Sequence, residues 1–218
     1  LPRDVGELRR AIGDDDAWRQ EFELEYLDEA TAWLPYEMIF ACEHEGAGRP
    51  DKFQDGETFI GNDIAAGGGD LWVAWVWERV GDVLWCREID EGRRISFAEQ
   101  DARLDALVKR YRPRRIAMDK TGLGEKPVED AIRRYGSGRV IGVQFTVASK
   151  LVIAGIGRAG FEDRRVRIPE GNVPLRADLH SLVKTVSETG APRFVAPRTD
   201  GSHADRTWAA FLGQYAAD

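Results

Sequence analysis

The chain has 218 residues, which is enough for one sizeable domain and a small appendage. Its formal net charge of −7 argues against a nucleic-acid-binding module that works by bulk positive charge, although local patches can still bind phosphate. The two cysteines imply no disulfide framework and fit a reducing compartment. No apolar run is long enough to span a membrane, and no signal peptide is found. Because the sequence starts with Leu rather than Met, we expect it to be a fragment of a longer protein.

Residues 1–55 are predicted to form a helical linker or appendage. Acidic residues open the segment 14–28, as suits a helix amino terminus, and three aromatic residues recur there every four positions on one face. A second short helix is predicted over 35–44, with a proline in its first turn. The polar, glycine-rich segment 45–55 is expected to be a linker, so that residues 56–218 form the main domain.

Three strands are predicted in succession at the start of the main domain. The first ends with one carboxylate, Asp63, and a glycine turn; runs rich in Val and Trp follow at 71–77 and 82–89. Three consecutive strands form an antiparallel meander. An Asp within a buried strand is costly unless it is paired or holds a metal, and the alternative is a strand-end Asp that caps the turn.

The rest of the chain alternates helices and short strands, which predicts an α/β fold. A helix begins at Ser96, where Ser96 and Glu99 form a capping-box pattern, and ends before Pro113. The strand 114–119 ends on a second carboxylate, Asp119. The later elements are predicted as a helix at 126–135, a strand at 139–145, a helix at 149–162, an edge-like strand at 166–169, a helix at 175–187, a strand at 193–196 and a final helix at 203–216.

Three acids occupy positions where an α/β sheet gathers function: Asp63 on the first strand, Asp119 at a strand end and Asp205 at the start of the last helix. Carboxylates that converge from distant segments repel one another unless cations neutralise them. Hard oxygen ligands suit Mg²⁺ or Mn²⁺ rather than zinc. Two such ions, about 3.5–4 Å apart, activate water and stabilise the leaving oxygen in phosphodiester cleavage. The pattern therefore predicts a site for two divalent cations.

The order of these segments resembles the ribonuclease H-like nuclease domain of a tailed-bacteriophage terminase large subunit, especially that of Mu-like phages. The matching segments are 59–65 with its glycine turn and Asp70, then 116–124, 149–151, 166–169 and 201–209, preceded by the lead-in segments 22–26 and 33–36. The resemblance implies a mixed sheet, made of the antiparallel meander plus parallel strands, with flanking helices. It also implies that Asp63, Asp119 and Asp205 are catalytic and bind the metals.

The same resemblance implies a metal-dependent endonuclease that cuts concatemeric viral DNA in the host cytoplasm by two-metal hydrolysis. The implied partners are double-stranded DNA, the packaging ATPase domain of the same protein, the small terminase subunit and the portal; no membrane is implied. The phosphate-cradling motif Gly-x-x-x-x-Gly-Lys-Ser/Thr does not occur in this sequence, and the turn at 122–126 lacks its spacing. ATP hydrolysis is therefore not expected of this chain.

Two other functions are alternatives. Another ribonuclease H-like nuclease, of the resolvase or integrase type, would share the acids, and a non-catalytic module that docks on portal or capsid would use them structurally. Three further residues each have more than one interpretation. Asp70 either adds a fourth acid or caps the turn, and Lys150 either approaches the phosphate or the acids or is solvated. His203 either caps the last helix or lines the site, or it has a surface role.

Overall fold

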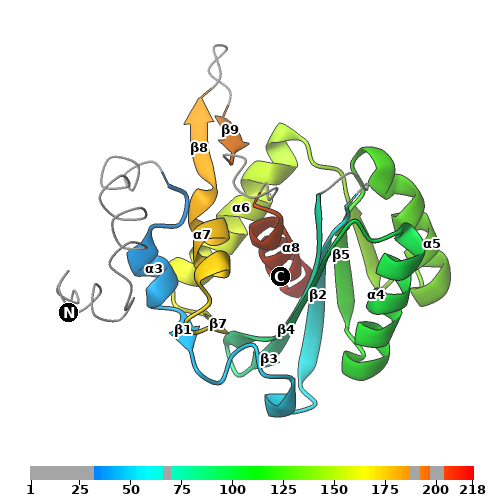
Figure 1. Ribbon diagram of the computed structural model, residues 1–218, viewed down its shortest axis with the longest axis horizontal. Coiled ribbons are helices and arrows are strands. Elements are labelled where there is room, and N and C mark those ends of the chain that lie inside the picture. Colours follow the sequence, from blue (N-terminus) through cyan, green and yellow to red (C-terminus); the bar gives the residue numbers. More distant parts are fainter. Residues whose placement is uncertain (1–31, 66–69, 187–191, 197–203) are drawn as a thin grey trace.

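The computed structural model describes residues 32–65, 70–186, 192–196 and 204–218. Within these residues, seven strands form one sheet in the order β1-β7-β4-β3-β2-β5-β6, and helices cover both of its faces (Figure 1). The predicted mixed α/β fold is therefore confirmed. The predicted helix at 14–28, the glycine turn at 66–69 and His203 lie outside the described residues.

The centre of the sheet is the predicted antiparallel meander. It consists of β2 (Glu57–Asp63), β3 (Leu71–Val80) and β4 (Val83–Arg93). Two strands extend it on the β2 side. β5 (Arg115–Asp119) runs parallel to β2, and β6 (Val140–Val143) runs parallel to β5. β2 is thus an internal strand whose two neighbours run in opposite directions.

The other side of the sheet differs from the prediction in two ways. The strand β7 (Val166–Pro169) is not at the edge, because β4 pairs with it on one side and β1 (Glu43–His44) on the other. The helix predicted over 35–44 is short, since α3 (Tyr36–Phe40) ends early and the chain extends to reach β7. The main-chain N–H of Ile168 donates to the carbonyl of Cys42, at 3.0 Å, and fixes this pairing.

The helices form two layers (Figure 1). One face of the sheet carries α4 (Phe97–Tyr111) and α5 (Glu125–Tyr135). The opposite face carries α6 (Val147–Glu162), α7 (Val173–Ser181) and α8 (Asp205–Ala217), and a 3₁₀ turn lies at Pro50–Lys52, with another at Gly122–Gly124. None of the helices in the described ranges is long and apolar enough to cross a membrane.

The helix predicted over 175–187 ends at Ser181, and this prediction was wrong. The next residues form β8 (Val183–Val186), which pairs antiparallel with β9 (Pro192–Val195) in a hairpin that projects from the body of the molecule (Figure 1). The residue types give the physical reason, because the sequence Val-Lys-Thr-Val is rich in β-branched side chains, which favour strands.

The side-chain alternation of β2 separates the core into two clusters. Phe59 belongs to the cluster under α6 and α8, whereas Ile60 belongs to the cluster under α4 and α5. At Gly61 the helix α8 approaches the strand so closely that a Cβ would lie 1.9 Å from the carbonyl oxygen of Ala209 and 2.3 Å from the nitrogen of Gly213. Glycine at 61 therefore sets how α8 lies across the sheet.

The described part of the segment 1–55 packs against the main domain. β1 joins the sheet, and Arg176 of α7 makes a bidentate ion pair with Glu43, with N–O distances of 2.5 and 2.7 Å. Glu78 of β3 accepts hydrogen bonds from the main-chain N–H groups of Gln54 and Gly56. The proposed domain boundary at residue 55 remains a prediction.

Candidate functional site

The structure brings the predicted acids to one end of the sheet. Asp63 is the last residue of β2 and Asp119 the last residue of β5, and these strands are parallel neighbours, so both acids emerge at the same edge. Alternation places Asp63 on the face of Gly61 and Asp119 on the face of Ala117, the face that α8 covers. Asp205 is the first residue of α8.

Asp63 is close enough to the other acids to be affected by their charges. Burial raises the pKa of its carboxyl well above the usual range, and the negative charges of Asp205, Asp119 and Asp178 raise it further. Lys150 is the cation that opposes this shift. Additional positive charge nearby would therefore favour the ionised form of Asp63.

Asp119 has a more clearly fixed orientation. Its Oδ1 accepts a hydrogen bond from the main-chain N–H of Thr121, at 2.8 Å, and the Thr121 hydroxyl accepts in turn from the main-chain N–H of Phe145. Burial still raises the pKa of Asp119, although the Thr121 bonds and Lys150 act in the opposite direction. The turn after β5 therefore holds this carboxylate toward the site.

Lys150 of α6 is held beside the acids by two aromatic rings. Its Nζ lies 5.1 Å from the ring centroid of Phe145 and 4.9 Å from that of Trp208. The charge of Lys150 lowers the pKa of both Asp63 and Asp119, although burial and, for Asp63, the neighbouring acids outweigh it. The role of Lys150 in the site remains a prediction.

The sequence analysis missed Asp178, a buried acid on α7. Its Oδ1 accepts hydrogen bonds from the main-chain N–H of Thr207, at 3.0 Å, and from the Thr207 hydroxyl, at 2.8 Å. A signal was present, because Asp178 follows Leu175 by three residues and so lies on the apolar, buried face of its helix. An acid in an apolar stripe requires a buried partner.

A half-buried arginine lies next to Asp205 in the sequence. Arg206 donates to both carboxylate oxygens of Glu91 on β4, at 2.6 and 2.8 Å, and its Nη1 lies 3.6 Å from Oδ2 of Asp178. Burial alone would lower the pKa of Arg206, but the hydrogen bond and charge of Glu91, with the charges of Asp178 and Asp205, raise it. Arg206 therefore remains a cation beside the acids.

The donor set suits a hard divalent cation, since every candidate ligand is a carboxylate. Burial, and after it the charges of the neighbouring acids, raises the pKa of Asp63. Among the residues that the structure describes, however, no group of three or more His, Cys, Asp or Glu side chains is already arranged to hold an ion. Asp70 is exposed and directly precedes β3. The acids therefore fit a metal by their chemistry, while their roles as ligands remain predictions.

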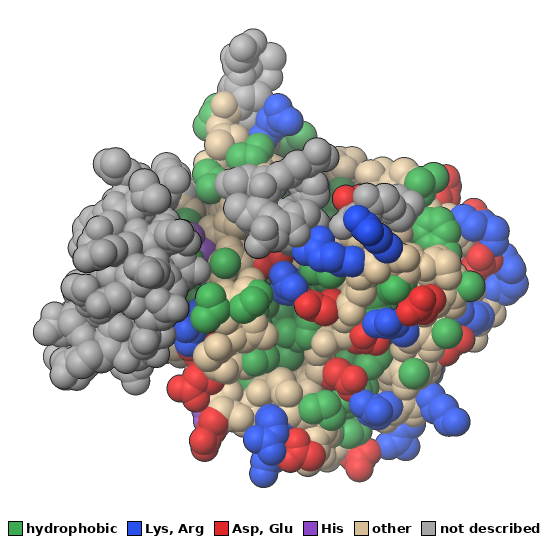
Figure 2. Space-filling model, viewed as in Figure 1, with side chains coloured by type: hydrophobic (Ala, Val, Ile, Leu, Met, Phe, Trp, Pro, Cys, Tyr) green, Lys and Arg blue, Asp and Glu red, His purple; other side chains and the backbone are tan. Residues whose placement is uncertain are grey.

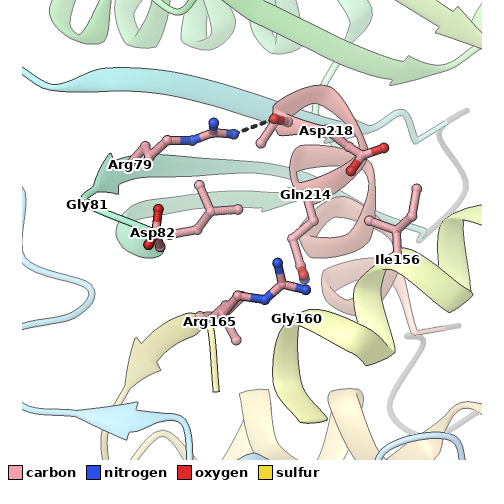
Figure 3. Close-up of a pocket in the computed structure, with 11 residues that line it drawn as sticks. Arg79, Gly81, Asp82, Ile156, Gly160, Arg165, Gln214 and Asp218 are labelled. Atoms are coloured by element: carbon pink, nitrogen blue, oxygen red, sulfur yellow. Dashed lines mark hydrogen bonds between the residues drawn. The ribbon is translucent and has the colours of Figure 1, made fainter. Parts of the chain in front are cut away.

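A pocket of about 440 Å³ lies at the far end of α8 from Asp205 (Figure 3). Its lining includes Arg79 of β3, Gln214 of α8 and Arg165, which immediately precedes β7. Asp63 pairs with Val73 and Glu57 with Arg79, so the pocket and the acids occupy opposite ends of β2. The acid site is thus not part of this pocket.

The exposed surface carries no large patch of one charge on the face that Figure 2 shows, where acidic and basic side chains are interspersed. Several surface arginines are paired with acids. Arg112 contacts Asp55 and Arg134 contacts Asp101, with N–O distances of 2.7 and 2.8 Å. Exposed pairs of this kind contribute little stability and are screened by salt.

Comparison with known proteins identifies the family of this arrangement. A family model described as the Terminase RNaseH-like domain matches residues 60–213. The crystal structure of the large terminase nuclease from thermophilic phage G20c has a TM-score of 0.63 at 16% sequence identity, covering 75% of this chain and 83% of that one. Other crystals of the G20c nuclease contain bound magnesium, cobalt or zinc.

Two further structures share the fold. The HK97 bacteriophage large terminase has a TM-score of 0.63 at 12% identity and covers 97% of this chain and 50% of that one. The large terminase nuclease domain of bacteriophage SPP1, with bound Mn, has a TM-score of 0.52 at 14% identity, covering 81% and 96%. At these identities the likeness establishes the fold. A search of curated protein sequences gave no match.

Proposed function

Because the chain belongs to the family of terminase ribonuclease H-like domains, we propose that it is a metal-dependent endodeoxyribonuclease that cuts concatemeric viral DNA during packaging. The observation that carries this proposal is the convergence of acids on Asp63, whose pKa is raised by burial and by Asp205, Asp119 and Asp178. Burying several carboxylates close together lowers the stability of the fold, unless the cluster binds a cation.

Asp63, Asp119 and Asp205 would hold two divalent cations, Mg²⁺ or Mn²⁺, through carboxylate oxygens. When bound, the cations supply the charge that activates water and stabilises the departing 3′ oxygen. The protein contributes the positioning. Thr121 orients Asp119, α8 presents Asp205, and Lys150 offsets part of the negative charge on Asp63 and Asp119.

The wider setting is part of the same proposal. Residues 56–218 would be the nuclease domain and residues 1–55 a helical linker toward the packaging ATPase domain. Double-stranded DNA would be the substrate, the small terminase subunit and the portal would be partners, and the host cytoplasm would be the location. Two findings support this setting: the family assignment, and the structural similarity to the HK97 large terminase, which covers nearly the whole chain.

Cleavage of supercoiled plasmid tests the proposed activity. We expect nicking and linearisation with Mn²⁺ or Mg²⁺ and none with EDTA. Asp63→Asn, Asp119→Asn and Asp205→Asn should each reduce the rate by about 100-fold or more, and double variants should lose little further, since residues that act as a unit are not additive. Asp82→Asn is the matched control, because this exposed acid lies at the opposite end of the sheet.

The outcomes separate the proposed activity from its alternatives. A wild-type chain that folds but does not cut with any of these metals would favour the docking module, in which the acids are structural. Strong preference for four-way junctions over linear duplex would favour a resolvase. Normal cleavage by one of the three Asn variants would remove that residue from the site.

A further inference from the structure

The helix that carries Asp205 has no capping side chain of its own. Residue Ala204, in the N-cap position of α8, has left-handed backbone angles, φ 63° and ψ 34°, and no side-chain hydrogen bond to the helix. The first N–H groups of an α-helix have no partner within the helix. The start of α8 is buried, so these groups need partners from elsewhere in the protein.

Asp178 supplies that partner from another helix. Its Oδ1 accepts from the main-chain N–H of Thr207, at 3.0 Å, which is the third residue of α8 and the group that an N-cap side chain normally binds. The hydroxyl of Thr207 lies 2.8 Å from the same Oδ1 and 2.9 Å from the carbonyl oxygen of Asp178. Asp178 is 5% exposed and Thr207 0%, so water does not compete for these bonds.

Arg206 braces the same turn on the other side. It is anchored to Glu91 on β4 by two hydrogen bonds, and its Nη1 faces Oδ2 of Asp178 at 3.6 Å. The turn that begins with Asp205 is therefore fixed to both β4 and α7. Oδ1 of Asp178 accepts from the main-chain N–H of Thr207, and Oδ2 faces Arg206.

We propose that Asp178 is a positioning residue of the active site, which caps α8 from α7 and thereby holds Asp205 in place beside Asp63 and Asp119. The inference rests on the proposed function, because it gives Asp178 a part in metal-dependent cleavage.

The test compares Asp178→Asn with Asp178→Ala. Asn keeps an oxygen that accepts from Thr207 but removes the charge, whereas Ala removes both. We expect plasmid cleavage by Asp178→Ala to fall by about 100-fold, the cost of a misplacement near 1 Å, and to need more Mn²⁺ for half-maximal rate. Asp178→Asn should stay within a few-fold of wild type. In EDTA, hydrogen exchange at the Thr207 amide should accelerate in Asp178→Ala and not in Asp178→Asn.

Ser96→Ala provides the matched control, since Ser96 caps α4 on the opposite face by accepting from the main-chain N–H of Glu99, at 3.2 Å. It should lower the melting temperature without slowing cleavage. Equal losses in Asp178→Asn and Asp178→Ala would overturn the proposal, because charge rather than capping would then matter. Unchanged cleavage by Asp178→Ala would overturn it too. If the wild-type chain does not cut DNA, the proposed function is refuted instead. Hydrogen exchange at the Thr207 amide and a titration of the protein with Mn²⁺ then decide the inference.

Discussion

At the scale of single residues, Asp63 is the group on which the others act. It ends an internal strand, and the charges of three other acids reach it, with Lys150 as the opposing cation. Lys150 itself packs against the rings of Phe145 and Trp208. Burial and these like charges on Asp63 have a measurable consequence for stability.

We expect Asp63→Asn to stabilise the metal-free protein at neutral pH. The pKa of Asp63 is raised in the folded state above its value of about 3.9 in unfolded chains. Between these two values the folded state binds more protons, so the free energy of unfolding decreases as the pH rises through that window. Asn removes this penalty, and a gain of about 1 kcal/mol would raise the melting temperature by about 2–4 °C.

Thermal unfolding in EDTA from pH 4 to pH 8 measures this effect. The advantage of Asp63→Asn should shrink as the pH falls toward 4, where Asp63 of the wild type is also protonated in the folded state. Asp82→Asn should show no such trend. A variant that is less stable than wild type at pH 7 would mean that the carboxylate of Asp63 makes a stabilising bond.

The positions of Asp63, Asp119 and Asp205 on their elements could be predicted, whereas Asp178 was missed. Strand ends and helix starts are local features, marked by the glycine turn after Asp63 and by the change of periodicity after Asp119. The role of Asp178 depends on the packing of α7 against α8, where Thr207 is 29 positions away in the sequence. The spacing of residues within one segment does not indicate which residue of another segment will be the partner.

At the scale of elements, the errors concern short segments whose state depends on their neighbours. β7 was expected at an edge because it ends in Pro169, yet β1 pairs with it. This pairing was not predicted, because the two residues of β1 lie in a segment that was predicted to be helical. The segment 183–186 was expected to continue α7, but its β-branched residues favour a strand, and β8 pairs with β9. Longer elements with strong periodicity, such as α4, were predicted correctly.

Two glycines of α6 should respond in opposite ways to the same substitution. A Cβ at Gly157 would lie 2.1 Å from the ring of Phe211 on α8, whereas a Cβ at Gly155 would meet nothing within 4 Å. We expect Gly155→Ala to stabilise the protein by about 0.5–1 kcal/mol through helix propensity. Gly157→Ala should destabilise it by about 1–3 kcal/mol, because it overpacks the contact of α6 with α8.

Urea unfolding of the two variants distinguishes these effects. A shift of the midpoint urea concentration without a change in the m-value gives the change in the free energy of unfolding. Equal stabilisation by both substitutions would show that α6 and α8 are not in the close contact described above. Since α6 carries Lys150 and α8 carries Asp205, Gly157→Ala should also slow plasmid cleavage, whereas Gly155→Ala should not.

At the scale of the whole molecule, contacts far apart in sequence tie the segment before residue 56 to the sheet. Glu78 and Arg87, on β3 and β4, form a buried ion pair with an N–O distance of 2.5 Å. Glu78 also accepts from the main-chain N–H groups of Gln54 and Gly56, and Arg87 donates to the carbonyl of Gly46, at 3.3 Å. Removing one partner of such a pair costs about 3–5 kcal/mol, because the other charge stays buried.

The two cysteines report whether that segment opens separately from the domain. Cys42, before β1, is fully buried, and its thiol donates to the carbonyl of Phe161 at 3.4 Å. Burial raises the pKa of Cys42 to about 11 and also raises the pKa of Cys86, a fully buried residue of β4. Because the thiolate is the reactive form, neither should react with a thiol reagent at pH 8 while the protein is folded.

We therefore expect both thiols of the native protein to react with 5,5′-dithiobis(2-nitrobenzoate) slowly and at one rate, which is set by global opening, and to react within seconds in guanidinium. Val186→Cys, at a site 70% exposed on β8, is the positive control and should add one fast thiol. Peptide mapping of the labelled protein identifies which cysteine reacts. If Cys42 reacts much faster than Cys86, residues 32–55 open independently of the sheet, and the contacts of β1, Gln54 and Gly56 do not hold them in the domain. Equal rates would mean that residues 32–55 unfold together with the nuclease domain, so that any boundary between linker and domain lies before them.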